Sequence, residues 1–261
     1  NLDPTGYKKA LAEFEPRHQS LVAERDKLEQ TVVRPALKAW LAGRATPDID
    51  ADWVVLQPTE AAAPDVVKFD IQADGTVQAR GTQFFALNYT LDAETKLRDI
   101  RALRLEALHD DALPNGGPGM TADGGFHLSN VKLQATPREG KGTPVDVKYV
   151  RRTVVVGSNG KPEVETKNPG AWTVNKPDGR DHRAVFELEK PLDFESGTKL
   201  TLTLQFAGNH QGIGRLRVSF ASGEVPAADA AEVSEAALAI LRRLPNEGKK
   251  ELSSDDLTTL A

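Results

Sequence analysis

The stretch Lys199-Leu200-Thr201-Leu202-Thr203-Leu204-Gln205-Phe206 alternates between polar and apolar side chains at every position. Because successive side chains of a strand point to opposite faces, this alternation predicts a strand with one buried face. Residues 103–107, 183–188 and 216–220 alternate in the same way, and we expect polar members such as Arg104 and Glu106 to face water. Shorter strands are expected at 53–56, 66–71, 76–80, 84–91, 126–135, 145–156 and 172–174.

Many short strands without helices between them are typical of antiparallel sheets. We therefore predict a mainly β fold, an antiparallel two-sheet β-sandwich or jelly roll, over residues 50–222. The pairs Asp74-Gly75 and Asn159-Gly160 lie between apolar runs and predict tight turns with positive φ. The apolar phase shifts between Leu128 and Val131, which predicts a β-bulge.

Both ends of the chain read as helical segments, residues 1–46 and 227–261. Between residues 7 and 41 the apolar side chains recur at three- and four-residue spacing, as on one face of a helix. This stripe needs a partner, which is its own sandwich, a second copy in a coiled coil, or a domain outside this sequence. Leu238, Leu241 and Leu244 share one face of the second segment.

The composition excludes several classes of function. The 33 basic and 38 acidic residues are interspersed and give a net charge of −5, so there is no broad basic face for nucleic acid. The sequence has no cysteine, which excludes disulfides, thiolate metal sites and a thiol nucleophile. No apolar run is long enough to span a bilayer, and the polar opening is not a signal peptide, so we expect part of a longer chain.

Three stretches resemble a known family. They are residues 100–108 (IRALRLEAL) with 117–119 (GPG) and 124–129 (GGFHLS), residues 184–188 (AVFEL) with 197–206 (GTKLTLTLQF), and His210 with 213–219 (IGRLRVS). Their order and spacing resemble the large multidomain surface proteins of planctomycete-type bacteria, which combine cytochrome-c-like domains with planctomycete-specific domains of unknown function. Met120, Asp123, Gly125 and His127 depart from the family's pattern.

The resemblance implies a galactose-binding-like jelly-roll module in an extracytoplasmic protein, at the cell surface or in the periplasm. It implies neighbouring domains of the parent chain as partners, with the haem domain elsewhere. It supplies no ligand.

The loop between His109 and Gly125 is a candidate metal site. It holds Asp110, Asp111 and Asp123 among glycines and prolines. Calcium takes six to eight oxygen ligands from such a flexible loop, so we predict a structural Ca²⁺ held by these three aspartates. Plain turn formation explains the same Gly and Asp residues.

Trp172 is the candidate platform for a sugar, because sugars stack on planar aromatic faces beside polar groups. It follows a Pro-Gly turn, and Arg180 and His182 come soon after it. The alternative is that Trp172 packs in the core, as we expect for Trp53 and Trp40.

His210 and Arg215 complete the predicted ligand-binding set, as part of a polar cluster between two strands that also fits a solvated hairpin loop. No histidine stands at metal-ligand or catalytic-triad spacing, so we expect no enzyme. The leading hypothesis is a non-catalytic carbohydrate-binding module for a polysaccharide or glycan, with Trp172 near the site. It predicts an exposed aromatic side chain beside polar groups. The alternative is a structural or protein-interaction module, which predicts a buried Trp172 and an exposed apolar stripe on the first helix.

Overall fold

The computed structural model describes residues 14–24, 27, 31, 53–64, 67–81, 88–140, 142–156, 161–175, 177, 179–206, 212–228 and 232–234. The chain divides into two units, Ile49–Leu238 and a terminal unit made of Asn1–Asp48 and Ala239–Ala261. Of the terminal unit, residues 14–24 are described as an α-helix, which confirms part of the predicted N-terminal helix. No helix in the described residues is both long and apolar enough to cross a membrane.

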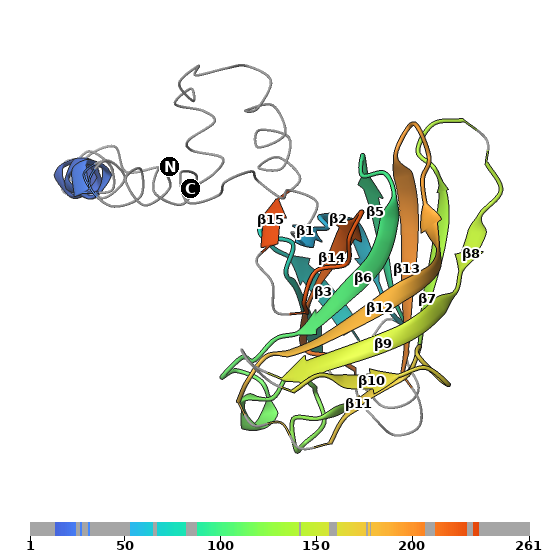
Figure 1. Cartoon of the computed structure of the whole chain (residues 1–261). Helices are drawn as coiled ribbons and strands as arrows, with labels where there is room; N and C mark the ends of the chain where they lie inside the picture. The colour runs from blue at the N-terminus through green and yellow to red at the C-terminus, as the bar shows by residue number, and fades with distance from the viewer. Residues whose placement is uncertain are drawn as a thin grey trace. The chain divides into compact units, whose positions relative to one another are not determined.

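The larger unit is a sandwich of two β-sheets that face each other (Figure 1). The first sheet, sheet A, has the strand order β10-β9-β12-β6-β14-β1-β15, with β4 also paired to β14 and β3 to β4. Its strands are β1 Trp53–Val55, β3 Val67–Ile71, β4 Val77–Gly81, β6 Ile100–Ala107, β9 Tyr149–Val156, β10 Glu163–Glu165, β12 His182–Leu192, β14 Arg215–Ser222 and β15 Glu232–Ser234.

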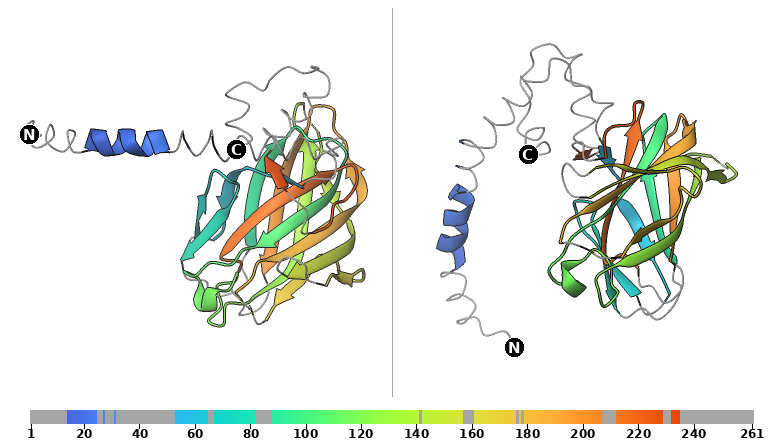
Figure 2. Two further views of the ribbon diagram at one scale, coloured as in Figure 1. Left: turned by 60° about the vertical axis from the view of Figure 1, so that its left-hand side comes forward. Right: turned by 60° about the horizontal axis from the view of Figure 1, so that its bottom comes forward.

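The second sheet, sheet B, has the order β11-β7-β13-β5-β2, with β8 paired to β7 (Figure 2). Its strands are β2 Pro58–Ala62, β5 Asn88–Thr95, β7 Phe126–Pro137, β8 Val145–Val147, β11 Trp172–Val174 and β13 Thr198–Phe206. The 3₁₀-helix η3, Pro114–Gly116, lies in the loop before β7. Every pair is antiparallel except β1 with β15, so the mainly β sandwich is confirmed.

The alternation in β13 determines which of its side chains lie in the core and which lie on the outer face of sheet B. Leu200, Leu202, Leu204 and Phe206 are at most 2% exposed and belong to the core between the sheets. The residues between them therefore point to the outer face of sheet B. The predicted bulge is confirmed in the neighbouring strand, because Gln205 pairs with Asn130 and Phe206 with Leu128.

The sequence predicted wrongly that Arg104 and Glu106 face water. Both are buried, although they point away from the main core. Val225 and Ala228, which follow β14, pack with Trp53 and other apolar residues in a second cluster. The Trp53 indole donates a hydrogen bond to the Ala227 carbonyl, and Arg104 donates to the Ala228 carbonyl, so this covering segment, residues 225–228, packs on the outer face of sheet A around Trp53 and Arg104.

Some elements were missed. Neither β2 nor β10 was predicted, and β15 is a strand inside the segment expected to be helical. The rest of the predicted C-terminal helix, Trp40 and the Asn159-Gly160 turn lie outside the described residues, although β9 and β10 pair antiparallel on either side of that turn.

The predicted turn at Asp74-Gly75 joins β3 to β4, and Gly75 has a φ of +78°. A Cβ on Gly75 would lie 2.6 Å from Val55 Cγ1 and 2.8 Å from the Leu56 carbonyl oxygen. We expect Gly75→Ala to lower the free energy of unfolding by more than about 1 kcal/mol, measured by urea denaturation. Gly140→Ala is the control, because Gly140 has a φ of +93° but no atom within 4 Å of a new Cβ. An equal loss of unfolding free energy in the two variants would show that the contacts of the new Cβ with Val55 and Leu56 do not destabilise the fold.

Candidate functional site

The outer face of sheet B carries polar side chains in rows that cross the strands. Strand β13 lies between β5 and β7, and its register aligns each outward residue with one on either side. The rows are Glu94–Lys199–Thr136, Asp92–Thr201–Gln134, Thr90–Thr203–Lys132 and Asn88–Gln205–Asn130. The fold thus assembles one polar surface from residues that are far apart in the sequence.

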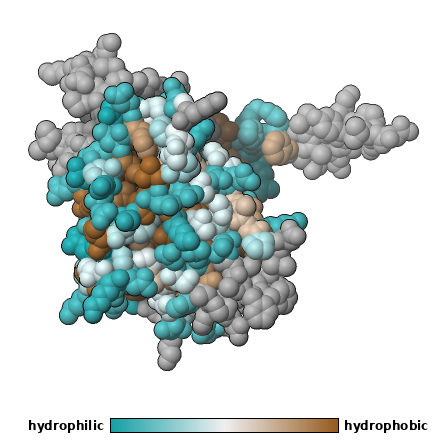
Figure 3. Space-filling model, turned by 90° about the vertical axis from the view of Figure 1, so that its right-hand side faces the viewer, coloured by the Kyte–Doolittle hydropathy of each residue, from teal (hydrophilic) through white to brown (hydrophobic). Residues whose placement is uncertain are grey.

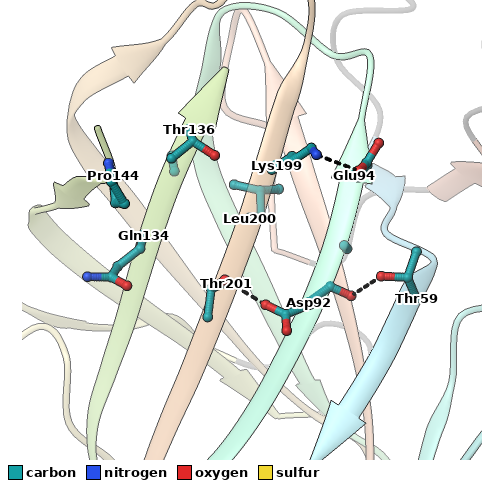
Figure 4. A pocket seen from close by; sticks show the side chains of 11 residues that line it. Thr59, Asp92, Glu94, Gln134, Thr136, Pro144, Lys199, Leu200 and Thr201 are labelled. Atoms are coloured by element: carbon teal, nitrogen blue, oxygen red, sulfur yellow. Dashed lines mark hydrogen bonds and ion pairs between the residues drawn. The ribbon is translucent and has the colours of Figure 1, made fainter. Parts of the chain in front are cut away.

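The surface has a first hollow of about 300 Å³ over β2, β5, β13 and β7 (Figure 4). The Thr201 hydroxyl donates to Asp92 Oδ1 at 2.6 Å, and the Thr59 hydroxyl donates to the Asp92 carbonyl at 3.0 Å. Lys199 Nζ lies 3.4 Å from Glu94 Oε1. The lining residues are Thr59, Asp92, Ala93, Glu94, Gln134, Ala135, Thr136, Pro144, Lys199, Leu200 and Thr201.

Glu94 is held in its charged form. The hydrogen bond from Arg138, at 3.1 Å, is the main reason that the pKa of Glu94 lies below its usual value, and Lys199 acts in the same direction. The Glu94 carboxylate is therefore suited to accept hydrogen bonds and not to donate a proton.

A second hollow of about 710 Å³ lies over β7, β8 and β13. One wall comes from residues 168–170, where Gly170 lies so close to Asn130 that a Cβ on it would be 2.3 Å from Asn130 Oδ1. The lining residues are Asn130, Val131, Lys132, Leu133, Gln134, Asp146, Val147, Lys148, Tyr149, Asn168, Pro169, Gly170, Thr203 and Gln205.

Gln134 lines both hollows, which therefore adjoin each other. Its Nε2 donates to Asp146 Oδ1 at 2.8 Å, across the β7–β8 pair. The side of the module on which β7 and β8 lie in Figure 1 is mostly hydrophilic, with apolar patches between the polar residues (Figure 3). The two hollows together form the candidate binding surface.

The structure corrects the role predicted for Trp172. This residue is only 3% exposed, in the core, and its ring meets Phe126 edge-on with the centroids 4.9 Å apart. A stacking platform needs a ring face open to solvent, so Trp172 offers no platform for a sugar.

The other predicted ligand-binding residues are not brought to the candidate surface. His182 is buried in β12, Arg180 is exposed in the preceding loop, and Arg215 Nη1 donates to the His109 carbonyl at 3.4 Å. None of these three lines either hollow. His210 lies outside the described residues.

The three aspartates of the predicted metal site each have local contacts. Asp110 Oδ1 accepts from the Ala112 amide at 2.9 Å, and Asp123 Oδ1 accepts from the Thr121 hydroxyl and the Gly125 amide. Asp111 is fully exposed, 3.1 Å from His109 Nε2. Within the described ranges, no three His, Asp or Glu side chains gather as metal ligands would. These contacts are those of turns, and the calcium ion stays a prediction.

No family model matches the chain, and no curated protein matches it. Among solved structures, it is similar to a variant of a family 29 carbohydrate-binding module, with 11% identity, 69% of this chain and 96% of that chain covered, and a TM-score of 0.27. It is also similar to TmCBM27, a module studied for mannan recognition, with 8% identity, coverage of 67% and 89%, and a TM-score of 0.25.

A third similar structure is a family 11 module from Clostridium thermocellum in complex with a β-1,3-1,4-mixed-linked tetrasaccharide. The identity is 11%, 67% of this chain and 91% of that chain are covered, and the TM-score is 0.24. Because these identities and TM-scores are low, the site rests on the residues of this chain alone.

Proposed function

We propose that the chain is a non-catalytic carbohydrate-binding module of a larger extracytoplasmic protein, and that a glycan lies across the outer face of sheet B. The observation that carries the proposal is the pair of adjoining hollows lined mainly by hydroxyl, amide and charged side chains. Sugar hydroxyls both donate and accept hydrogen bonds, and threonine hydroxyls and glutamine amides do the same.

The strength of binding follows from the same lining. The two hollows contain one aromatic residue, Tyr149, which is half-buried and packs against Phe186. Without an open ring face, the affinity rests on hydrogen bonds, each contributing about 0.5–1.5 kcal/mol. Three such bonds contribute about 1.5–4.5 kcal/mol in total, so we expect weak binding, with a dissociation constant of roughly 1 mM or higher.

Binding without catalysis fits the carboxylates of the first hollow. Glycoside hydrolysis needs one carboxyl group with a raised pKa as the general acid. The pKa of Glu94 is lowered by Arg138, and Asp92 is hydrogen-bonded by Thr201. Both groups are arranged as hydrogen-bond acceptors.

We expect Gln134→Ala to weaken glycan binding about 2- to 12-fold, because Gln134 reaches both hollows and one or more hydrogen bonds are lost. The chain is first screened by affinity gel electrophoresis against glucan, mannan, xylan and galactan chains and polygalacturonate, and the best ligand is titrated by calorimetry. Gln72→Ala is the matched control, since Gln72 is an exposed glutamine that lines neither hollow. Retention by none of these polysaccharides, or unchanged binding in Gln134→Ala, would contradict the proposal.

A further inference from the structure

The second hollow differs from the first in its charge. It is lined by two lysines, Lys132 and Lys148, and by one acid, Asp146, which already accepts a hydrogen bond from Gln134. In the part of the chain that the structure describes, no carboxylate lies within ion-pair distance of either lysine. In the first hollow, by contrast, Lys199 is paired with Glu94.

Neutral hydrogen-bonding groups surround these two lysines. Asn130, Gln205 and Thr203 lie on the strands of the floor, and Asn168 comes from the wall. Asn130 Nδ2 donates to Gln205 Oε1 at 3.2 Å, which fixes both amides and leaves the Gln205 amide protons for a ligand. A sugar ring in this hollow would find partners for its hydroxyls, and a negative substituent would find two ammonium groups.

Resting on the proposed glycan-binding function, we propose that the second hollow binds a sugar unit that carries an anionic group, a carboxylate or a sulfate ester, between Lys132 and Lys148. The whole chain has a net charge of −5, which repels a polyanion. Attraction to an acidic glycan must therefore be local, and these lysines supply it where the amides hold the ring. Hydrogen bonds to a charged group are stronger than neutral ones, so the acidic sugar is preferred.

The test compares polysaccharides that differ only in charge, with the full chain as the binding protein. The carboxylate arm uses polygalacturonate and its methyl ester, and the sulfate arm uses a sulfated carrageenan and the same carrageenan after removal of its sulfate esters. At low salt we expect one acidic polymer to bind about tenfold more tightly than its neutral counterpart. The preference should shrink as salt is added, because exposed charges are screened.

The role of the two lysines is tested with a double variant that combines Lys132→Gln and Lys148→Gln. The ratio of acidic to neutral affinity should fall to about one, and the arginine pair Lys132→Arg with Lys148→Arg should restore it, since the charge returns. Lys68→Gln is the matched control, because Lys68 is exposed on β3 and lines neither hollow.

The outcomes separate the two proposals. Equal binding of the acidic and neutral polymers would overturn the anionic sugar while glycan binding stands. A preference that survives in the double glutamine variant would overturn the assignment to these lysines. If none of the polymers retained the protein, both the glycan-binding function and the anionic-sugar proposal would be overturned.

Discussion

Glu106→Gln is expected to lower the free energy of unfolding by about 3–5 kcal/mol, the cost of removing one partner from a buried ion pair. The Glu106 side chain is fully buried. Arg183 Nε donates to its Oε1 and Arg217 Nε to its Oε2, both at 2.9 Å. Arg104 Nη2 lies 3.4 Å from Oε2.

The cost arises from the arginines that remain. Arg104 is 1% exposed, lies over the Trp53 ring at 5.1 Å, and donates to the Ala228 carbonyl of the covering segment. The Glu106→Gln variant removes the carboxylate that lies 3.4 Å from this buried guanidinium, which makes the burial of the Arg104 charge more costly. Urea denaturation at neutral pH measures the loss.

Glu187→Gln is the matched control. The Glu187 carboxylate pairs with Arg151, whose side chain is 49% exposed, so we expect a loss of at most about 1 kcal/mol. A Glu106→Gln variant no less stable than Glu187→Gln would show that the buried ion pairs of Glu106 do not stabilise the fold more than an exposed pair does.

The same cluster gives a pH dependence with a definite sign. Burial by itself would raise the pKa of Glu106, but the charge of Arg104 and the hydrogen bond from Arg217 outweigh it, so the pKa lies below its ordinary value of 4.5. A carboxyl whose pKa is lowered by folding stabilises the native state above its unfolded pKa and loses this contribution as the pH falls through its folded pKa. The difference in stability between the wild type and Glu106→Gln should therefore shrink in acid below pH 4.5.

The strands were predictable from the sequence because alternation reports which side chains a sheet buries. In β13 every second residue is apolar, and that face does lie in the core. Alternation says nothing about which strands become neighbours. The first hollow needs Asp92, Gln134 and Thr201 from three strands that pair only in the folded sheet. Separately, each of them looks like an ordinary solvated residue.

Arg104 and Glu106 could not be recognised as buried for a related reason. Their strand has the same alternation as β13, which predicts a face open to water. Arg104 is covered by the segment 225–228, which follows the last long strand and carries no strand or helix pattern of its own. Glu106 is contacted by Arg183 and Arg217 from the two neighbouring strands. The contact between Trp53 and Ala227 joins residues 174 positions apart in the sequence.

Trp172→Ala is expected to lower the free energy of unfolding by about 3–5 kcal/mol, the usual loss when a large aromatic side chain is removed from a core. Trp172 packs edge-on against Phe126, and its strand pairs with β7 through Leu128. Trp172→Phe keeps an aromatic ring in contact with the core and should cost less. Thermal and urea unfolding of the two variants measure both losses.

Glycan binding by the two Trp172 variants shows whether Trp172 is a core residue or a stacking platform for a sugar. At a temperature where each variant is fully folded, the dissociation constant should stay within about twofold of the wild type, because Trp172 lines neither hollow. Gln134→Ala should behave in the opposite way, with weaker binding and unchanged stability, since Gln134 is exposed. A folded Trp172→Ala variant that has wild-type stability but no longer binds glycan would contradict the burial of this ring. It would place the glycan-binding site at Trp172.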